Sequence, residues 1–265
     1  MPLTKNTPDH GAQPIFPGAP WIALAIFLTA IEIHFLSVKL SSNGFVASLA
    51  ASQGVIDGLP PWRIYQSRVL GPYLVKGIEH LFGLPSPLAY LAFIISCLLI
   101  TKLMVIRFGL RHTAGLTPTL LMLISGSLLF AMLLDASWLY PWDMSGLVLS
   151  TLFVVMVLGG IRWPWFLPLA AVAFLNRESG IFICVWLFAQ GLLGDGAEAG
   201  RKSPNIWMMA AAGITALAGL AETEWLRAHL MIRELGPELD LQRGLITPGQ
   251  TAWFHWKLGD NLAGL

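Results

Sequence analysis

The sequence predicts an all-α, polytopic membrane protein, on the evidence of its composition and its long apolar runs. Of the 265 residues, 55% are hydrophobic and only 12% are charged, whereas a soluble domain averages about 25% charged residues. The net charge of +1 gives no basic field for nucleic acid. These figures argue against a soluble enzyme, a disordered chain and a disulfide-stabilised scaffold.

About 20 apolar residues are needed for a helix to cross the hydrocarbon core of a bilayer. We expect about seven short-to-full membrane helices within residues 20–221, after a flexible cytoplasmic tail at 1–19. Residues 222–265 are expected to form an amphipathic outer tail, which packs on the outer face or leads to a missing helix. The apolar runs are 20–40, 86–106, 113–134, 144–161, 163–175, 179–194 and 203–221.

Basic residues beside the runs predict the orientation, because Lys and Arg are retained on the cytoplasmic side. That side would then hold the N-terminus, and the outer side would hold the loop 41–85 and the turn 135–143. In the outer loop, residues 68–83 alternate apolar and polar positions with helical period. We expect an interfacial amphipathic helix there, with a short membrane span as the alternative. The basic residues that predict the orientation are Lys102, Arg107, Arg111, Arg162, Arg201 and Lys202.

Ionisable groups within or beside membrane segments are costly, which makes them functional candidates. The motif Asn176-Arg177-Glu178-Ser179 breaks an apolar stretch. It forms either a wet pocket lined by Arg177 and Glu178 or a tight turn capped by Asn176. Asp143 follows Tyr140 and Trp142, and it is either a helix N-cap or part of the rim of the same pocket.

Two further polar groups need an explanation. The segment 57–68 brings Asp57, Arg63, Tyr65 and Arg68 to the outer face, where the arginines either bind phosphate or anchor lipid headgroups. In the first helix, Glu32 would lie about 18 Å from the start. It must be paired, protonated or facing water, and we expect a helix–helix contact.

Three short motifs carry a resemblance over residues 20–195. They are Arg68-Val69-Leu70-Gly71-Pro72, Trp142-Asp143 and Asn176-Arg177-Glu178-Ser179. Together with the helix order they resemble the N-terminal module of GT-C-type membrane glycosyltransferases. These enzymes transfer a sugar from a polyprenyl-phosphate carrier at the outer membrane face. The resemblance implies a GT-C-like module, a multi-pass location in the bacterial cytoplasmic (inner) membrane, and membrane lipid and a polyprenyl-phosphate sugar as partners.

The same resemblance suggests roles for the polar residues. Asp57, or alternatively Asp143, would be the general base. Arg63, Arg68 and Arg177 would stabilise the leaving phosphate, Glu178 would orient Arg177, and Tyr65 would contribute to substrate binding. The chain departs from the family where the usual catalytic acid should directly follow the first helix, since Asp57 comes late. No cofactor beyond the lipid-linked sugar donor is implied, and neither is a divalent metal.

Two other classes of function stay open at this point. The chain could be a non-catalytic accessory or assembly subunit bound to partner membrane subunits, or a small transporter. An enzyme needs Asp57 or Asp143 and at least one arginine around one cavity. A subunit should keep these residues paired with one another, and a transporter needs a polar path that reaches Glu32.

Overall fold

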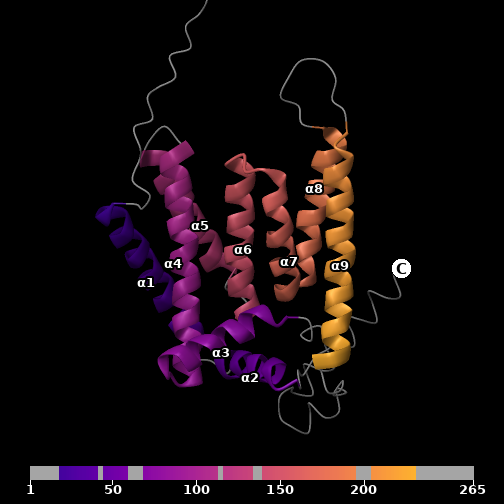
Figure 1. The fold of residues 1–265 in the computed structure, drawn as a ribbon. Helices are drawn as coiled ribbons and strands as arrows, with labels where there is room; N and C mark the ends of the chain where they lie inside the picture. Colours follow the sequence, from indigo (N-terminus) through magenta and orange to yellow (C-terminus); the bar gives the residue numbers. More distant parts are fainter. Residues whose placement is uncertain are drawn as a thin grey trace, which may run out of the picture.

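A computed structural model describes residues 18–40, 44–58, 68–112, 116–133, 139–194 and 204–230. Within these ranges the protein is all-helical, as predicted (Figure 1). The α-helices are α1 (Ala19–Leu40), α2 (Gly44–Ile56), α3 (Leu70–Phe82), α4 (Ser86–His112), α5 (Leu116–Leu133), α6 (Pro141–Leu158), α7 (Phe166–Asn176), α8 (Ile181–Leu193) and α9 (Ile206–Leu230). Two short 3₁₀ turns, Trp163–Trp165 and Glu178–Gly180, precede α7 and α8.

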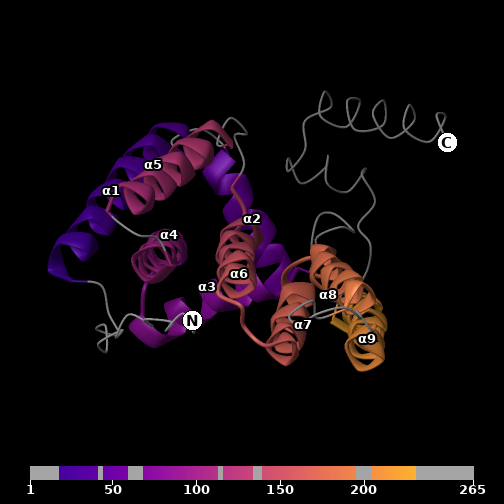
Figure 2. The same ribbon diagram turned by 90° about the horizontal axis from the view of Figure 1, so that it is seen from above.

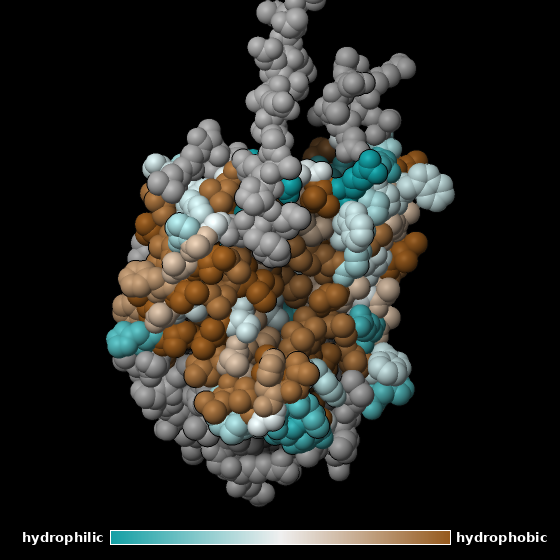
Figure 3. All heavy atoms as spheres, turned by 60° about the vertical axis from the view of Figure 1, so that its left-hand side comes forward, coloured by the Kyte–Doolittle hydropathy of each residue, from teal (hydrophilic) through white to brown (hydrophobic). Residues whose placement is uncertain are grey.

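Four described helices are long and apolar enough to cross a membrane. The qualifying segments are Ala19–Leu36, Ser86–Arg111, Pro141–Leu158 and Ile206–Leu226. Large apolar side chains on their outer faces are exposed, with Trp207 at 81% and Leu217 at 70%. Hydrophobic residues also dominate the middle of the face drawn in Figure 3. A soluble monomer rarely exposes so much apolar surface, so these helices suit a lipid environment. The larger number of about seven spans remains a prediction.

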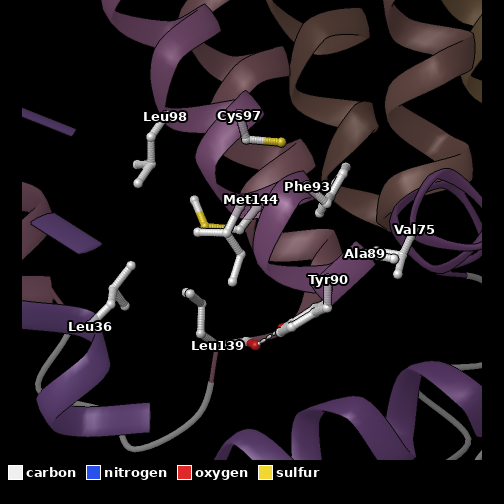
Figure 4. Packing of buried hydrophobic residues seen from close by; sticks show 10 residues of the cluster. Leu36, Val75, Ala89, Tyr90, Phe93, Cys97, Leu98, Leu139 and Met144 are labelled. Atoms are coloured by element: carbon white, nitrogen blue, oxygen red, sulfur yellow. Dashed lines mark hydrogen bonds between the residues drawn. The ribbon is translucent and has the colours of Figure 1, made fainter. Parts of the chain in front are cut away.

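The long helices stand side by side, and the two views of the ribbon agree on their order (Figures 1 and 2). α4 packs on α1, α5 and α6, and α7 connects α6 to the α8–α9 pair. One core lies between α4 and α6 around Tyr90, Phe93 and Met144, and Tyr90 donates a hydrogen bond to the Leu139 carbonyl (Figure 4). A second core joins α6 to α7, α8 and α9 around Phe166, Phe174 and Leu187.

The helix α3 lies across one end of the bundle, where the amphipathic helix was predicted (Figure 1). It buries Gly71, Pro72 and Val75 and exposes Leu81 and Phe82. It ends at Gly83, which has a φ of 61°, a left-handed conformation that glycine adopts without steric cost. Together with α2 it covers the end at which α6 begins, so the polar motifs of the sequence meet at this end.

Three features of the fold differ from expectation. α2 forms within residues that the sequence assigned to a loop, and it packs on α3 and α4. α4 continues to His112, so Lys102 lies inside a membrane helix and not in the basic turn. α9 runs through residue 222 to Leu230 as one helix, and the boundary drawn at 221 falls within it.

Glu32 makes the helix–helix contact that the sequence predicted. Its carboxylate accepts a hydrogen bond from the Lys102 ammonium, and the two side chains are only 4% and 7% exposed. Because each charge alone in hydrocarbon would cost several kcal/mol, the pair fixes α1 against α4. His34, two residues further on, is exposed and stands edge-on to Phe35.

The close approach of α3 to α6 depends on Gly71. A Cβ at this position would lie 2.5 Å from the Pro141 carbonyl carbon, whereas a Cβ at Gly77 on the same helix would meet nothing within 4 Å. We predict that Gly71→Ala lowers the free energy of unfolding in detergent by about 1–3 kcal/mol. Gly77→Ala should leave it unchanged or raise it by about 0.5–1 kcal/mol. Equal effects of the two substitutions in thermal unfolding would contradict the close packing of α3 on α6.

Candidate functional site

The first turn of α6 is built by local sequence. Tyr140 is the extended N-cap residue and Pro141 occupies the first helical position, where its missing N–H is harmless. An Asp143 oxygen accepts the Tyr140 backbone N–H at 3.1 Å. Asp143 was expected as the N-cap itself, but it acts from the third helical position, as an acid in a capping box does.

Asn176 ties the end of α7 to this turn. Its Nδ2 donates to the Trp142 carbonyl at 2.9 Å, and its Oδ1 accepts a hydrogen bond from the Ser145 hydroxyl. The Pro141 carbonyl oxygen lies 3.0 Å from the same hydroxyl, which has one hydrogen to share between the two acceptors. Asn176 is only 3% exposed, so its amide replaces water for a group of buried polar atoms. The expected role of Asn176, a cap within its own turn, is therefore replaced by a bridge between helices.

This bridge brings Arg177 beside Asp143. After Asn176 the chain becomes extended at Arg177 and then enters the turn Glu178–Gly180. An Arg177 guanidinium nitrogen lies 3.8 Å from an Asp143 carboxylate oxygen, with the side chains 48% and 36% exposed. The two groups form a wide ion pair that water and ligands can reach. The two motifs are therefore in contact, and the pocket expected at this point stays a prediction.

Arg68 approaches the same turn from the start of α3. It is 8% exposed, and its guanidinium carbon lies 5.5 Å from the centre of the Trp142 ring. Trp142 in turn stacks on Tyr140, with 4.6 Å between ring centres. A guanidinium over an indole face is held by cation–π attraction. Arg68 and Arg177 therefore both contact the first turn of α6, Arg68 at Trp142 and Arg177 at Asp143.

We call Arg68, Asp143, Arg177 and their supports Trp142 and Asn176 the α6 rim cluster. Its arginine and aspartate charges sum to +1, which favours an anionic ligand. Arg177 is the exposed arginine of the cluster, whereas Arg68 is buried against Trp142. A guanidinium binds phosphate or carboxylate oxygens through paired N–H groups. The cluster therefore provides an anion-binding position next to a carboxylate.

Of the other predicted site residues, two are described by the structure and two lie outside the described residues. Asp57, at the end of α2, is exposed and accepts a hydrogen bond from Gln53 at 2.9 Å. Glu178 is half-buried in the turn after Arg177. Arg63 and Tyr65 lie in 59–67, outside the described residues.

Two contributions to the α6 rim cluster, from Trp142 and from Asn176, were not predicted from the sequence. Trp142 was assigned to an interfacial belt, yet it is 1% exposed and supports Arg68; its place directly before an acid at a helix start was the available signal. The bridging role of Asn176 has no local signal, because its partners lie more than 30 residues away. Within the residues that the structure describes, no group of three or more His, Cys, Asp or Glu side chains could hold a metal ion.

We predict that Asn176→Ala destabilises the fold, because it leaves the buried Trp142 carbonyl without the Asn176 donor and removes the contact of Ser145 with α7. The loss of buried hydrogen bonds should cost about 1–3 kcal/mol in the free energy of unfolding in detergent. Ser179→Ala, an exposed change in the same motif, is the matched control and should be neutral. An Asn176→Ala protein as stable as the control would show that the bridge does not hold α7 to α6.

Comparisons of the chain with protein-family models, with curated proteins and with solved structures find no match.

Proposed function

We propose that this protein is a GT-C-like membrane glycosyltransferase that takes its sugar from a polyprenyl-phosphate carrier. The observation that supports this proposal most directly is the ion pair of Arg177 and Asp143, 3.8 Å apart, with Arg68 over the ring of the neighbouring Trp142. A departing phosphate needs cations, and an attacking hydroxyl needs a base. The α6 rim cluster supplies both kinds of group in one place.

The position of the cluster supports a lipid-borne substrate. It lies at the end of the bundle covered by α2 and α3 (Figure 1), whereas Arg107 and Arg111 lie near the other end of α4. If these basic residues face the cytoplasm, the cluster faces the outer side of a bacterial inner membrane. The exposed Leu81 and Phe82 of α3 would then lie at the headgroup level.

In the proposed reaction the acceptor hydroxyl attacks the anomeric carbon of the sugar. The bond between that carbon and the phosphate oxygen breaks, and the phosphate keeps the electron pair. Arg177 binds the phosphate oxygens and stabilises the charge that develops on them. Asp143 takes the hydroxyl proton, and Arg68 raises the local positive potential. Asp57 is the alternative base, because it is exposed at the end of α2 beside α3.

We predict that the protein in nanodiscs binds a polyprenyl phosphate more tightly than the neutral polyprenol of equal chain length. Arg177→Ala should weaken phosphate-lipid binding about tenfold or more, since a charge-assisted hydrogen bond contributes about 1.5–3 kcal/mol. Arg177→Lys should restore part of the binding. Native mass spectrometry of the released complexes measures the affinity of the unchanged protein for both lipids. It also measures the affinity of the two Arg177 variants for the phosphate lipid.

Arg162→Ala is the matched control, because Arg162 is an exposed arginine after the opposite end of α6. It should leave the affinity for the phosphate lipid unchanged. Equal affinity for the phosphate and the neutral alcohol, or equal losses in Arg162→Ala and Arg177→Ala, would contradict the proposal. Transfer of a radiolabelled sugar from the carrier, abolished by Asp143→Asn or by Asp57→Asn, would then identify the base.

One observation favours the accessory-subunit alternative. Both Asp143 oxygens already have protein partners, one in the Tyr140 N–H and one in Arg177. A purely structural cluster would be arranged in the same way. In that case Arg177→Ala would lower the thermal stability of the protein, and neither lipid would be preferred.

A further inference from the structure

A cavity of about 150 Å³ lies beside the Glu32–Lys102 ion pair. Its walls come from α1, α4, α5 and α6. Glu32 and Lys102 are each more than about 10 Å from either end of their helices at 1.5 Å per residue. The cavity therefore lies within the thickness of the bundle and not at an end.

The walls combine aliphatic side chains with a few polar groups. Glu32, Thr101 and Lys102 lie on one side, and Ser127 and Thr151 on α5 and α6. The Thr101 hydroxyl is buried and has no hydrogen-bond partner among the described residues. The Thr151 hydroxyl donates to the Leu147 carbonyl at 2.8 Å, so its donor is already used.

The ion pair keeps hydrogen-bonding capacity after it forms. Lys102 has three N–H donors, and one of them is used on Glu32. Glu32 and Lys102 both line the cavity, together with the Thr101 hydroxyl, which has no partner among the described residues. Burying such polar groups in a membrane interior without hydrogen-bond partners would cost several kcal/mol of free energy. The cavity thus contains donors and an acceptor that call for a polar occupant.

Charge decides which polar occupant fits. The pair is electrically neutral as it stands, and an ion entering the cavity would add an uncompensated charge at low dielectric. A hydroxyl group both donates and accepts, and it satisfies Lys102, Glu32 and Thr101 without adding charge. We propose that this cavity is an intramembrane hydroxyl-binding site, filled by water or by the hydroxyl of an uncharged alcohol.

The size of the cavity agrees with this assignment. A single water needs about 10–15 Å³ of such volume, so the space holds several waters or one small alcohol. Gly126 lies on the wall, and a Cβ there would meet nothing within 4 Å. The Cβ of a larger residue at Gly126 would therefore enter open space at the wall.

Cysteine accessibility tests the proposal. Cys97 and Cys184 are first replaced by alanine, and Ser127→Cys is compared with Ile124→Cys, an exposed position on the same helix. The probe is 2-hydroxyethyl methanethiosulfonate, which is small, neutral and water-soluble, applied to protein in lipid vesicles. A thiol reacts as thiolate, which needs a hydrated surrounding. We expect Ser127→Cys to react at least tenfold faster than Ile124→Cys.

Two further substitutions test whether the polar groups and the free volume of the cavity cause the fast reaction at position 127. The double substitution Glu32→Leu with Lys102→Met removes the polar groups while keeping the volume, a replacement that buried ion pairs often tolerate. It should slow the reaction at position 127 at least tenfold. Gly126→Leu, which leaves the ion pair intact, should also slow it. If Ser127→Cys does not fold, Thr151→Cys on the opposite wall takes its place.

Equal reaction rates at positions 127 and 124 would overturn the proposal, as would a rate that the double substitution leaves unchanged. The source of the hydroxyl is identified by adding 1-hexanol. If 1-hexanol protects Ser127→Cys from the reagent, the site takes an alcohol hydroxyl; if it gives no protection, water is the occupant. Protection by hexane alone would show an apolar site and would contradict hydroxyl binding.

Discussion

The start of α6 is the point on which the rest of the structure depends. The backbone of α3 packs closely against this first turn at Gly71. The Asn176 amide at the end of α7 donates a hydrogen bond to the Trp142 carbonyl, and the Arg68 guanidinium lies over the Trp142 ring. Trp142 is almost completely buried there. Because three elements distant in sequence meet on one turn, a shift of this turn would separate Arg177 from Asp143. The geometry of the candidate site is thus set by packing and hydrogen bonds that are not themselves catalytic.

A second constraint acts deeper in the bundle, where Lys102 and Glu32 hold α1 on α4. The two polar centres differ in kind. The α6 rim cluster is partly exposed and carries a net charge, so it suits an anion. The buried pair is neutral and lies beside a cavity, so it suits an uncharged group. The apolar core around Tyr90 packs α4 against α6, the two helices that carry Lys102 and Asp143.

The sequence predicted the all-helical class and the long apolar helices because membrane segments follow from local composition. It also predicted the pairing of Glu32 and the meeting of Asp143 with Arg177, since isolated charges in apolar runs need partners. It could not predict that Lys102 would be the partner of Glu32, or that Asn176 would reach Trp142 and Ser145. These contacts depend on how helices pack across 30 to 70 residues of chain. α2 was missed for the same reason, since its helix is defined by its neighbours and not by a strong pattern of its own.

The central claim is that the α6 rim cluster binds the phosphate of a membrane lipid. A structure of the protein in a nanodisc with a non-hydrolysable polyprenyl-phosphate sugar analogue tests it most directly. The account predicts phosphate density within hydrogen-bonding distance of the Arg177 guanidinium, with the sugar beside Asp143. Phosphate density at another part of the bundle, with Arg177 still turned only toward Asp143, would contradict it.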